Sequence, residues 1–157
     1  MAEAQLKKYI ITESMISMLF NAAFSFGVTY LVLRSQPVVA KSELIIDALP
    51  QSFFVTFFGT LVPTLITRAR LRAGKITSQP YRKTFLPNNA LLRAISMGIM
   101  VGLAGYALHF LVINAVSIES LALSTTLTYK TLYGAALSWV VTPWALKIAF
   151  ADHVTEP

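Results

Sequence analysis

Four long stretches of apolar, almost uncharged residues dominate the chain. They span residues 15–33, 48–67, 94–116 and 126–146. Each is close to the roughly 20 residues that a helix needs to cross the hydrocarbon core of a bilayer. Asp47 precedes the second stretch as a plausible helix cap, with Pro50 in the first turn. The pattern therefore predicts an all-α integral membrane protein with four transmembrane helices.

Polar connections arrange the predicted helices as two helical hairpins. We expect an N-terminal hairpin over residues 1–73 and a C-terminal hairpin over residues 91–157. Between them, residues 74–90 contain Gly74 and Pro80, which are typical of turns and linkers. This segment is also rich in basic residues, so it is predicted to be a cytoplasmic linker.

The two hairpins resemble each other in sequence at a shift of 79 residues. At that shift, 16–18 (Ile-Ser-Met) aligns with 95–97 (Ile-Ser-Met), and Arg68 aligns with Lys147. Apolar residues match easily, so a chance likeness between helices of similar composition stays open. A true duplication would keep both hairpins in the same direction, and it predicts a pseudo-twofold axis along the membrane normal.

Basic residues predict the orientation of the chain. The chain has 13 Lys and Arg against 7 Asp and Glu. Seven of the basic residues lie in the central connection or beside it. These seven are Arg68, Arg70, Arg72, Lys75, Arg82, Lys83 and Arg93. Basic residues mark the cytoplasmic side, so both termini and this connection are expected there, in a cell inner membrane. We expect the seven to contact anionic lipid headgroups rather than nucleic acid.

The composition excludes several classes of protein. Hydrophobic residues make up 55% of the chain and charged residues 13%, against roughly 25% charged in soluble domains. The chain has no cysteine, which excludes disulfides and thiolate catalysis. His109 and His153 make a poor metal site, and no Gly-rich phosphate loop follows a strand. We therefore expect neither an enzyme nor a bound cofactor or metal.

Small residues at intervals of three or four suggest where helices approach closely. They are Ala94, Gly98, Gly102 and Gly105 in the third stretch, Ala23 and Gly27 in the first, and Gly134 and Ser138 in the fourth. Such spacing brings helix backbones together in membranes. It favours packing within this bundle, with homo-oligomer formation as the alternative. Four phenylalanines at positions 53, 54, 57 and 58 predict a bulky patch facing lipid or a partner protein.

Two prolines lie inside predicted helices. Pro63 and Pro143 lack a backbone N–H, so each frees a carbonyl four residues earlier, at Gly59 and Trp139. Either proline then produces a static kink, which is common in membrane helices, or a hinge with an ion-coordinating carbonyl.

Ionisable residues near the outer ends of the helices are the candidate site. Lys130, His109, Asp47 and Glu119 are predicted to form a polar cluster there. The structural alternatives are a lysine that extends to the headgroups and a histidine that bonds a neighbouring helix. Asn21 lies in an apolar stretch and is expected to bond another helix.

The second predicted helix carries a resemblance. It is led by a proline (47–52, Asp-Ala-Leu-Pro-Gln-Ser) and ends in arginine-rich sequence (67–70, Thr-Arg-Ala-Arg). In this it resembles small bacterial inner-membrane proteins of unknown function, and the resemblance implies no activity.

Two functional hypotheses follow from these patterns. The first is a non-enzymatic accessory or structural subunit of a membrane complex, based on the small-residue faces, the phenylalanine patch and few buried ionisable groups. The alternative is an oligomeric transporter or channel protomer for small molecules or ions, using polar groups near the outer leaflet. The expected partners are the lipid bilayer and either another membrane protein or further copies of the chain.

Overall fold

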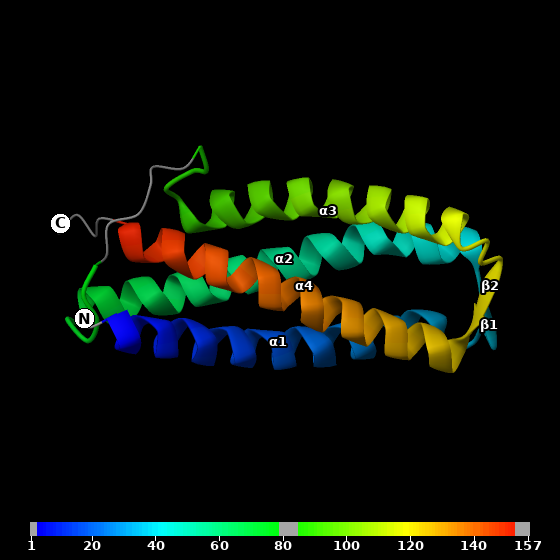
Figure 1. Ribbon diagram of the computed structural model, residues 1–157, viewed down its shortest axis with the longest axis horizontal. Helices are drawn as coiled ribbons and strands as arrows, with labels where there is room; N and C mark the ends of the chain where they lie inside the picture. Colours follow the sequence, from blue (N-terminus) through cyan, green and yellow to red (C-terminus); the bar gives the residue numbers. More distant parts are fainter. Residues whose placement is uncertain (1–2, 79–84, 153–157) are drawn as a thin grey trace.

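In the computed structural model, which describes residues 3–78 and 85–152, four long helices form an elongated bundle (Figure 1). In chain order the elements are α1 (Glu3–Leu33), β1 (Val38–Ala40), α2 (Lys41–Arg72), α3 (Ala90–Ala115), β2 (Ser120–Ala122) and α4 (Leu123–Ala151). All four helices are long and apolar enough to cross a membrane. The prediction of an all-helical chain with four helices of membrane-spanning length is confirmed.

The second helix begins earlier than the apolar pattern predicted. It starts at Lys41, so Asp47 and Pro50 lie inside it, and the prediction that Asp47 caps the helix is wrong. The Glu43 carboxylate instead accepts a hydrogen bond from the N–H of Ala40, the residue before the helix, at 3.3 Å. Polar residues thus extend the helix beyond its apolar part, and the Asp47 side chain is available for another partner.

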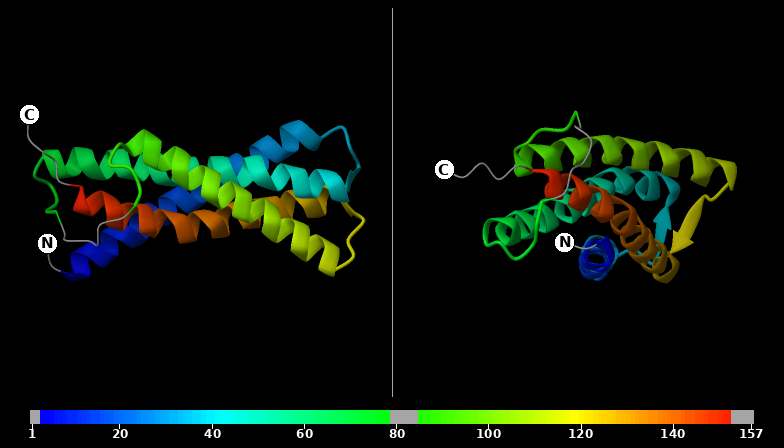
Figure 2. Two further views of the ribbon diagram at one scale, coloured as in Figure 1. Left: turned by 90° about the horizontal axis from the view of Figure 1, so that it is seen from above. Right: turned by 60° about the vertical axis from the view of Figure 1, so that its left-hand side comes forward.

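The order of the helices across the bundle differs from their order along the chain. The central pair is α2 and α4, with α3 packed on α2 and α1 packed on α4. Contact between α1 and α2, which follow each other in sequence, is much smaller. Figures 1 and 2 show the helices running along one long axis, with the start of α1 and the end of α4 at the same end of the bundle. We call this end, where α1 and α3 begin, the terminal end.

A short antiparallel strand pair joins the two connections at the opposite end, which we call the strand end (Figure 1). Val39 of β1 lies opposite Leu121 of β2. Val39 is fully buried in a small apolar cluster with Leu33, Leu44, Ile45 and Ile113. The apolar pattern predicted plain connections here, and the strand pair ties them together over the ends of the helices.

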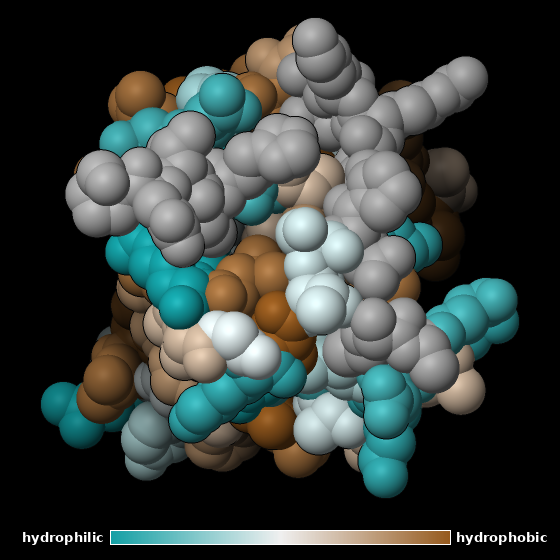
Figure 3. Space-filling model, turned by 90° about the vertical axis from the view of Figure 1, so that its left-hand side faces the viewer, coloured by the Kyte–Doolittle hydropathy of each residue, from teal (hydrophilic) through white to brown (hydrophobic). Residues whose placement is uncertain are grey.

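The bundle is polar inside and apolar outside. Large apolar side chains are exposed along all four helices. The buried face of α1 carries Glu13, Ser14, Ser17, Asn21, Ser25 and Thr29, and α2 buries Ser52, Thr56, Thr60, Thr64 and Thr67. An apolar exterior suits lipid, whereas the buried polar groups bond neighbouring helices or carbonyls of their own helix. Hydrophilic side chains also gather on the terminal end (Figure 3).

Candidate functional site

At the strand end, a buried lysine joins α4 to α2. Lys130 is fully buried, and its Nζ lies 3.1 Å from Oδ2 of Asp47. The same Nζ donates to the carbonyl of Leu44 at 3.3 Å. Gln51 donates from Nε2 to the Lys130 carbonyl at 2.8 Å. A buried ammonium is costly unless it is paired and hydrogen-bonded, so these contacts hold the lysine in place.

His109 of α3 lies beside this pair. Its Nδ1 is 2.7 Å from the carbonyl of Gly105, and its Nε2 has no hydrogen-bond partner within the described residues. The ring makes an edge contact with Tyr133 at 4.6 Å and a tilted contact with Tyr129 at 5.6 Å between ring centroids. The Lys130 ammonium lies 6.0 Å from the centre of the Tyr129 ring, so this tyrosine is near both the histidine and the lysine.

The structure brings three of the four predicted cluster residues into one region. Glu119 is the exception, because its side chain is 80% exposed and it pairs with Lys41 at 3.4 Å. A second lysine–carboxylate pair thus lies at the strand end, on the surface. It offers a matched comparison for the buried pair of Lys130 and Asp47.

A compact group of polar atoms, which we call the central cluster, lies where α1, α2 and α4 meet. Ser17 Oγ is 3.1 Å from Ser138 Oγ and 2.9 Å from Thr142 Oγ1. Asn21 Nδ2 donates to Ser138 Oγ at 3.0 Å, and Thr142 Oγ1 lies 3.2 Å from the Gly59 carbonyl oxygen. The cluster is closed to solvent, and Asn21 does bond another helix.

The central cluster includes the carbonyl that Pro63 frees. Proline has no N–H to donate to Gly59, so this carbonyl is open to a side-chain donor, and Thr142 supplies one. The chain remains helical through Pro63 in α2 and through Pro143 in α4.

Further buried hydroxyl groups continue the polar interior on both sides of the central cluster. Several of them have no hydrogen-bond partner within residues 3–78 and 85–152. They include Ser14, Ser25, Thr56, Thr64 and Thr126. We call these hydroxyls and the central cluster together the polar core. Each unpartnered hydroxyl represents a desolvation cost that helix packing alone does not require.

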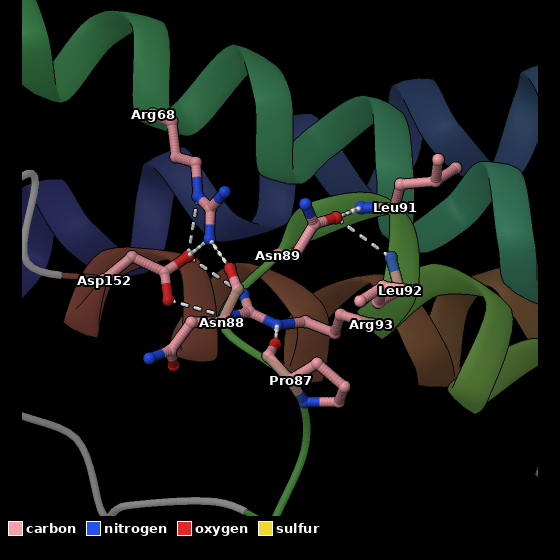
Figure 4. Close-up of polar contacts among 8 residues, drawn as sticks. All are labelled: Arg68, Pro87, Asn88, Asn89, Leu91, Leu92, Arg93 and Asp152. Atoms are coloured by element: carbon pink, nitrogen blue, oxygen red, sulfur yellow. Dashed lines mark hydrogen bonds and ion pairs between the residues drawn. The ribbon is translucent and has the colours of Figure 1, made fainter.

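At the terminal end, Asp152 binds two arginines (Figure 4). Arg93 is 1% exposed and grips both carboxylate oxygens, with Nη1–Oδ2 and Nη2–Oδ1 distances of 2.9 and 2.7 Å. Its Nε donates to the Pro87 carbonyl at 3.1 Å. Arg68 donates from Nε to Oδ2 at 2.8 Å and also contacts the Asn88 carbonyl. This bidentate arrangement ties the ends of α2, α3 and α4 together.

A second ion pair joins α1 to α2 at the same end. Glu13 is buried, and its Oε1 lies 2.5 Å from Nη1 of Arg70. The Arg70 guanidinium lies 5.1 Å from the centre of the Tyr9 ring, and the Tyr9 hydroxyl is 3.0 Å from Oγ1 of Thr67. Both ends of the polar core are therefore covered by ion pairs.

These ion pairs correct the expectation that all seven basic residues contact lipid headgroups. Arg93 is buried and turned inward, and Arg68 and Arg70 are held by carboxylates. Arg72 and Lys75 are exposed, whereas Arg82 and Lys83 lie outside the described residues. The pairing of these arginines with carboxylates could not be predicted from the sequence, because Glu13 and Asp152 are far from them along the chain.

The predicted small-residue faces behave differently in the different helices. On α3, Ala94, Gly98, Gly102 and Gly105 are all buried. A Cβ added at Gly98 would lie 2.9 Å from the Phe53 ring, so one of the four phenylalanines packs inside the bundle. On α4, Gly134 and Ser138 are buried against α1, where the Ser25 side chain contacts the Gly134 position.

On α1, the predicted packing of Ala23 and Gly27 within the bundle is wrong. Ala23 is exposed, and a Cβ added at Gly27 would meet no atom within 4 Å. The helix contacts α4 through its serine and asparagine face instead. Serine at intervals of four gives the same close approach as glycine or alanine, and it adds hydrogen bonds.

No known protein family, no curated protein and no solved structure matches this chain. The features that bear on function are therefore the arrangement of the polar core and the ion pairs at its two ends. Within the described residues, no group of three or more His, Asp and Glu side chains could hold a metal ion.

Proposed function

We propose that this protein is a protomer of a small transporter or channel, with the polar core as the path for an ion or a small polar solute. The observation that carries the proposal is a bundle interior made of hydroxyl and amide groups, several of them unpartnered, inside an apolar exterior. Such an interior is costly when closed, whereas water and polar solutes stabilise it when open.

The ion pairs at both ends support this proposal. Lys130 with Asp47 covers the polar core at the strand end, and Glu13 with Arg70 covers it at the terminal end. Each pair joins two helices, so each can separate when those helices move apart. In a transporter, closures at the two ends of a central site allow access from one side at a time.

An internal duplication, which we also propose, fits the same function. Glu13 and Arg93 are 80 positions apart, and their partners Arg70 and Asp152 are 82 positions apart, so the structural register differs from the 79-residue shift of the sequence match. The two ion pairs therefore occupy equivalent places with opposite charges. A pseudo-twofold axis along the bundle, between α2 and α4, accounts for this exchange.

A second set of contacts supports the same axis. Ser25 lies against Gly134, and Gly105 lies against Ser52, with the serine and the glycine exchanged. The central strand partners also match, because Val39 and Leu121 face each other and are 82 positions apart. Many transporters bind their substrate at the interface between repeats, which here is the contact region of α2 and α4 with α1 and α3.

We further propose that the terminal end faces the cytoplasm of a cell inner membrane. Three basic side chains are exposed near this end, those of Arg72, Lys75 and Lys147. Fewer basic side chains are exposed at the strand end. Basic residues at one end indicate the cytoplasmic side. Because four helices enclose little space, the proposal requires an oligomer of this chain.

The accessory-subunit hypothesis has less support. It was based partly on a patch of phenylalanines and on few buried ionisable groups. Phe53 packs against α3, and Lys130, His109, Arg93 and Glu13 are all buried. The small-residue face of α3 is occupied by α2 of the same chain, so it is not free for a partner protein.

Flux through reconstituted protein tests the proposal. The chain is purified in mild detergent, its mass is determined, and proteoliposomes are assayed with a panel of monovalent ions and small polar solutes. Lys130→Met and Asp47→Asn remove the buried pair, and Lys41→Met removes the exposed pair as the matched control. We expect a homo-oligomer whose flux changes at least about tenfold in the first two variants, because about 1.4 kcal/mol in a barrier is tenfold in rate. We expect no change in the control.

Two outcomes would overturn the proposal. One is a protein that carries none of the ions or solutes and co-purifies with another membrane protein at a fixed ratio, which supports the subunit hypothesis. The other is measurable flux that Lys130→Met and Asp47→Asn leave equal to that of Lys41→Met, which places the path elsewhere.

A further inference from the structure

We propose that the central cluster binds a monovalent metal cation of about the size of Na⁺. The site consists of Ser17, Gly59, Ser138 and Thr142, with Asn21 beside them. The inference rests on the proposed function and names the ion that the path would carry or use for coupling.

The oxygen atoms of the cluster have the spacing of cation ligands. Ser17 Oγ, Ser138 Oγ, Thr142 Oγ1 and the Gly59 carbonyl oxygen are joined by contacts of 2.9, 3.1, 3.2 and 3.4 Å. Oxygen ligands about 2.4 Å from a hard cation lie about 3.4 Å apart when they subtend a right angle. The four oxygens therefore need only small shifts to surround such an ion.

The hydrogen-bond count leaves a deficit of protons. The four oxygens make four mutual contacts, but the three hydroxyl groups supply three protons. Three protons suffice for the contacts of 2.9, 3.1 and 3.2 Å, so the contact left without a hydrogen is the 3.4 Å one between Ser138 Oγ and Thr142 Oγ1, where two lone pairs repel weakly. A cation removes this repulsion because it attracts every oxygen at once.

The Gly59 position provides a carbonyl without a backbone donor, in close contact with the other polar atoms of the cluster. Pro63 leaves the Gly59 carbonyl without a backbone donor, as in the interrupted helices that coordinate ions in transporters. A Cβ added at Gly59 would lie 3.3 Å from Thr142 Oγ1, 3.6 Å from Asn21 Nδ2 and 3.7 Å from Ser138 Oγ. The space is slightly too small for a methyl group, and it is lined by polar atoms.

Comparison of the two halves of the bundle shows that packing does not require this cluster. At the equivalent place on the α3 side, 80 positions after Ser17, stands Met97, and 82 positions after Gly59 stands Val141. Met97 and Val141 pack together in an apolar cluster, and Thr60 donates to the Met97 sulfur at 3.7 Å. The same helix arrangement is thus filled by apolar side chains on one side and by oxygens on the other.

The charges around the cluster favour a monovalent cation over a divalent one. All its groups are neutral, and the carboxylates of the ion pairs lie toward the two ends of the bundle. Divalent cations in proteins generally require carboxylate ligands. Neutral carbonyl and hydroxyl oxygens are the ligands that alkali-metal ions use in channels and transporters.

Cation-dependent stability of the purified protein tests the site. Thermal unfolding in detergent is followed in NaCl, KCl, LiCl and choline chloride at one ionic strength. We expect a saturable rise in the midpoint with Na⁺, because a ligand that binds only the folded state stabilises it by mass action. Thr142→Val and Ser138→Ala should abolish this rise, and the conservative Thr142→Ser should retain it.

The matched control is Thr126→Val, which removes a buried, unpartnered hydroxyl of the same helix near the strand end. This variant should respond to Na⁺ as the unchanged protein does. Equal midpoints in all four salts would overturn the inference and would mean that the cluster holds water or nothing. Loss of the Na⁺ response in Thr126→Val would overturn it as well. If the protein carries flux but its unfolding midpoint does not respond to cations, the proposed function stands and only the cation site is refuted. Failure of the site and failure of the proposed function are therefore distinguishable.

Discussion

Replacing Asp152 by asparagine should destabilise the bundle strongly, although the change keeps the shape of the side chain. The Asp152 carboxylate is the counter-charge of both Arg93 and Arg68. An asparagine still accepts one hydrogen bond, but its NH₂ group faces a guanidinium and it carries no charge. Arg93 cannot turn to solvent, because it is 1% exposed and its Nε is held by the Pro87 carbonyl.

The magnitude follows from this burial. At about 4 Å between charge centres and an effective dielectric constant of about 20, a guanidinium and a carboxylate attract by about 4 kcal/mol. Removing one partner of a buried pair typically costs about 3–5 kcal/mol, because the other charge stays buried. For Asp152→Asn we expect a loss in this range in the free energy of unfolding. Arg93→Lys should lose much of it too, because lysine cannot grip both carboxylate oxygens.

Glu13→Gln is the matched control, since Glu13 and Arg70 form the equivalent pair of the proposed repeat. Arg70 is 40% exposed and can turn to water, so we expect a loss of about 1 kcal/mol or less. Unfolding in detergent micelles, titrated with a denaturing detergent and followed by helical circular dichroism, measures all three variants. The reasoning is refuted if Asp152→Asn costs no more than Glu13→Gln.

Two further predictions concern helix packing and orientation. Gly134→Ala should cost about 1–3 kcal/mol, because its Cβ would collide with Ser25, and Ser25→Gly should restore most of the loss. Gly27→Ala, with no atom nearby, should change stability by less than about 0.5 kcal/mol in the same unfolding assay. In this cysteine-free chain, Ser35→Cys should react with an impermeant maleimide in intact cells and Ser78→Cys only after lysis. The reverse pattern would contradict the proposed orientation.

The four helices could be predicted from the sequence because an uncharged stretch of about 20 residues has few alternatives to a membrane helix. The ends of the helices could not be predicted in this way. Polar residues such as Lys41, Ser42 and Glu43 continue the helix, since backbone hydrogen bonding does not stop where hydrophobicity does. The strand pair was missed because three residues on each side give too short a pattern.

The candidate site was predicted in part. Lys130 and Asp47 were named because charges in apolar stretches need partners, and they do pair. The role of Asp152 could not be read, because its arginines are 59 and 84 positions away. The polar face of α1 was readable, since Ser17, Asn21 and Ser25 recur every four residues. The spacing of glycine and alanine predicted a contact at Ala23 and Gly27 instead. These two residues lie on the face of α1 that has no neighbouring helix.

The two sides of the bundle are held by different forces, and this decides which side separates more easily. On one side, Phe53 packs over Gly98 and Gly102, a contact with close van der Waals packing of a large ring. On the other side, α1 meets α4 through small hydroxyl groups such as Ser17, and polar contacts between membrane helices average about 0.6 kcal/mol each. Moving α1 away from α4 therefore costs less than moving α3 away from α2, and it opens the central cluster.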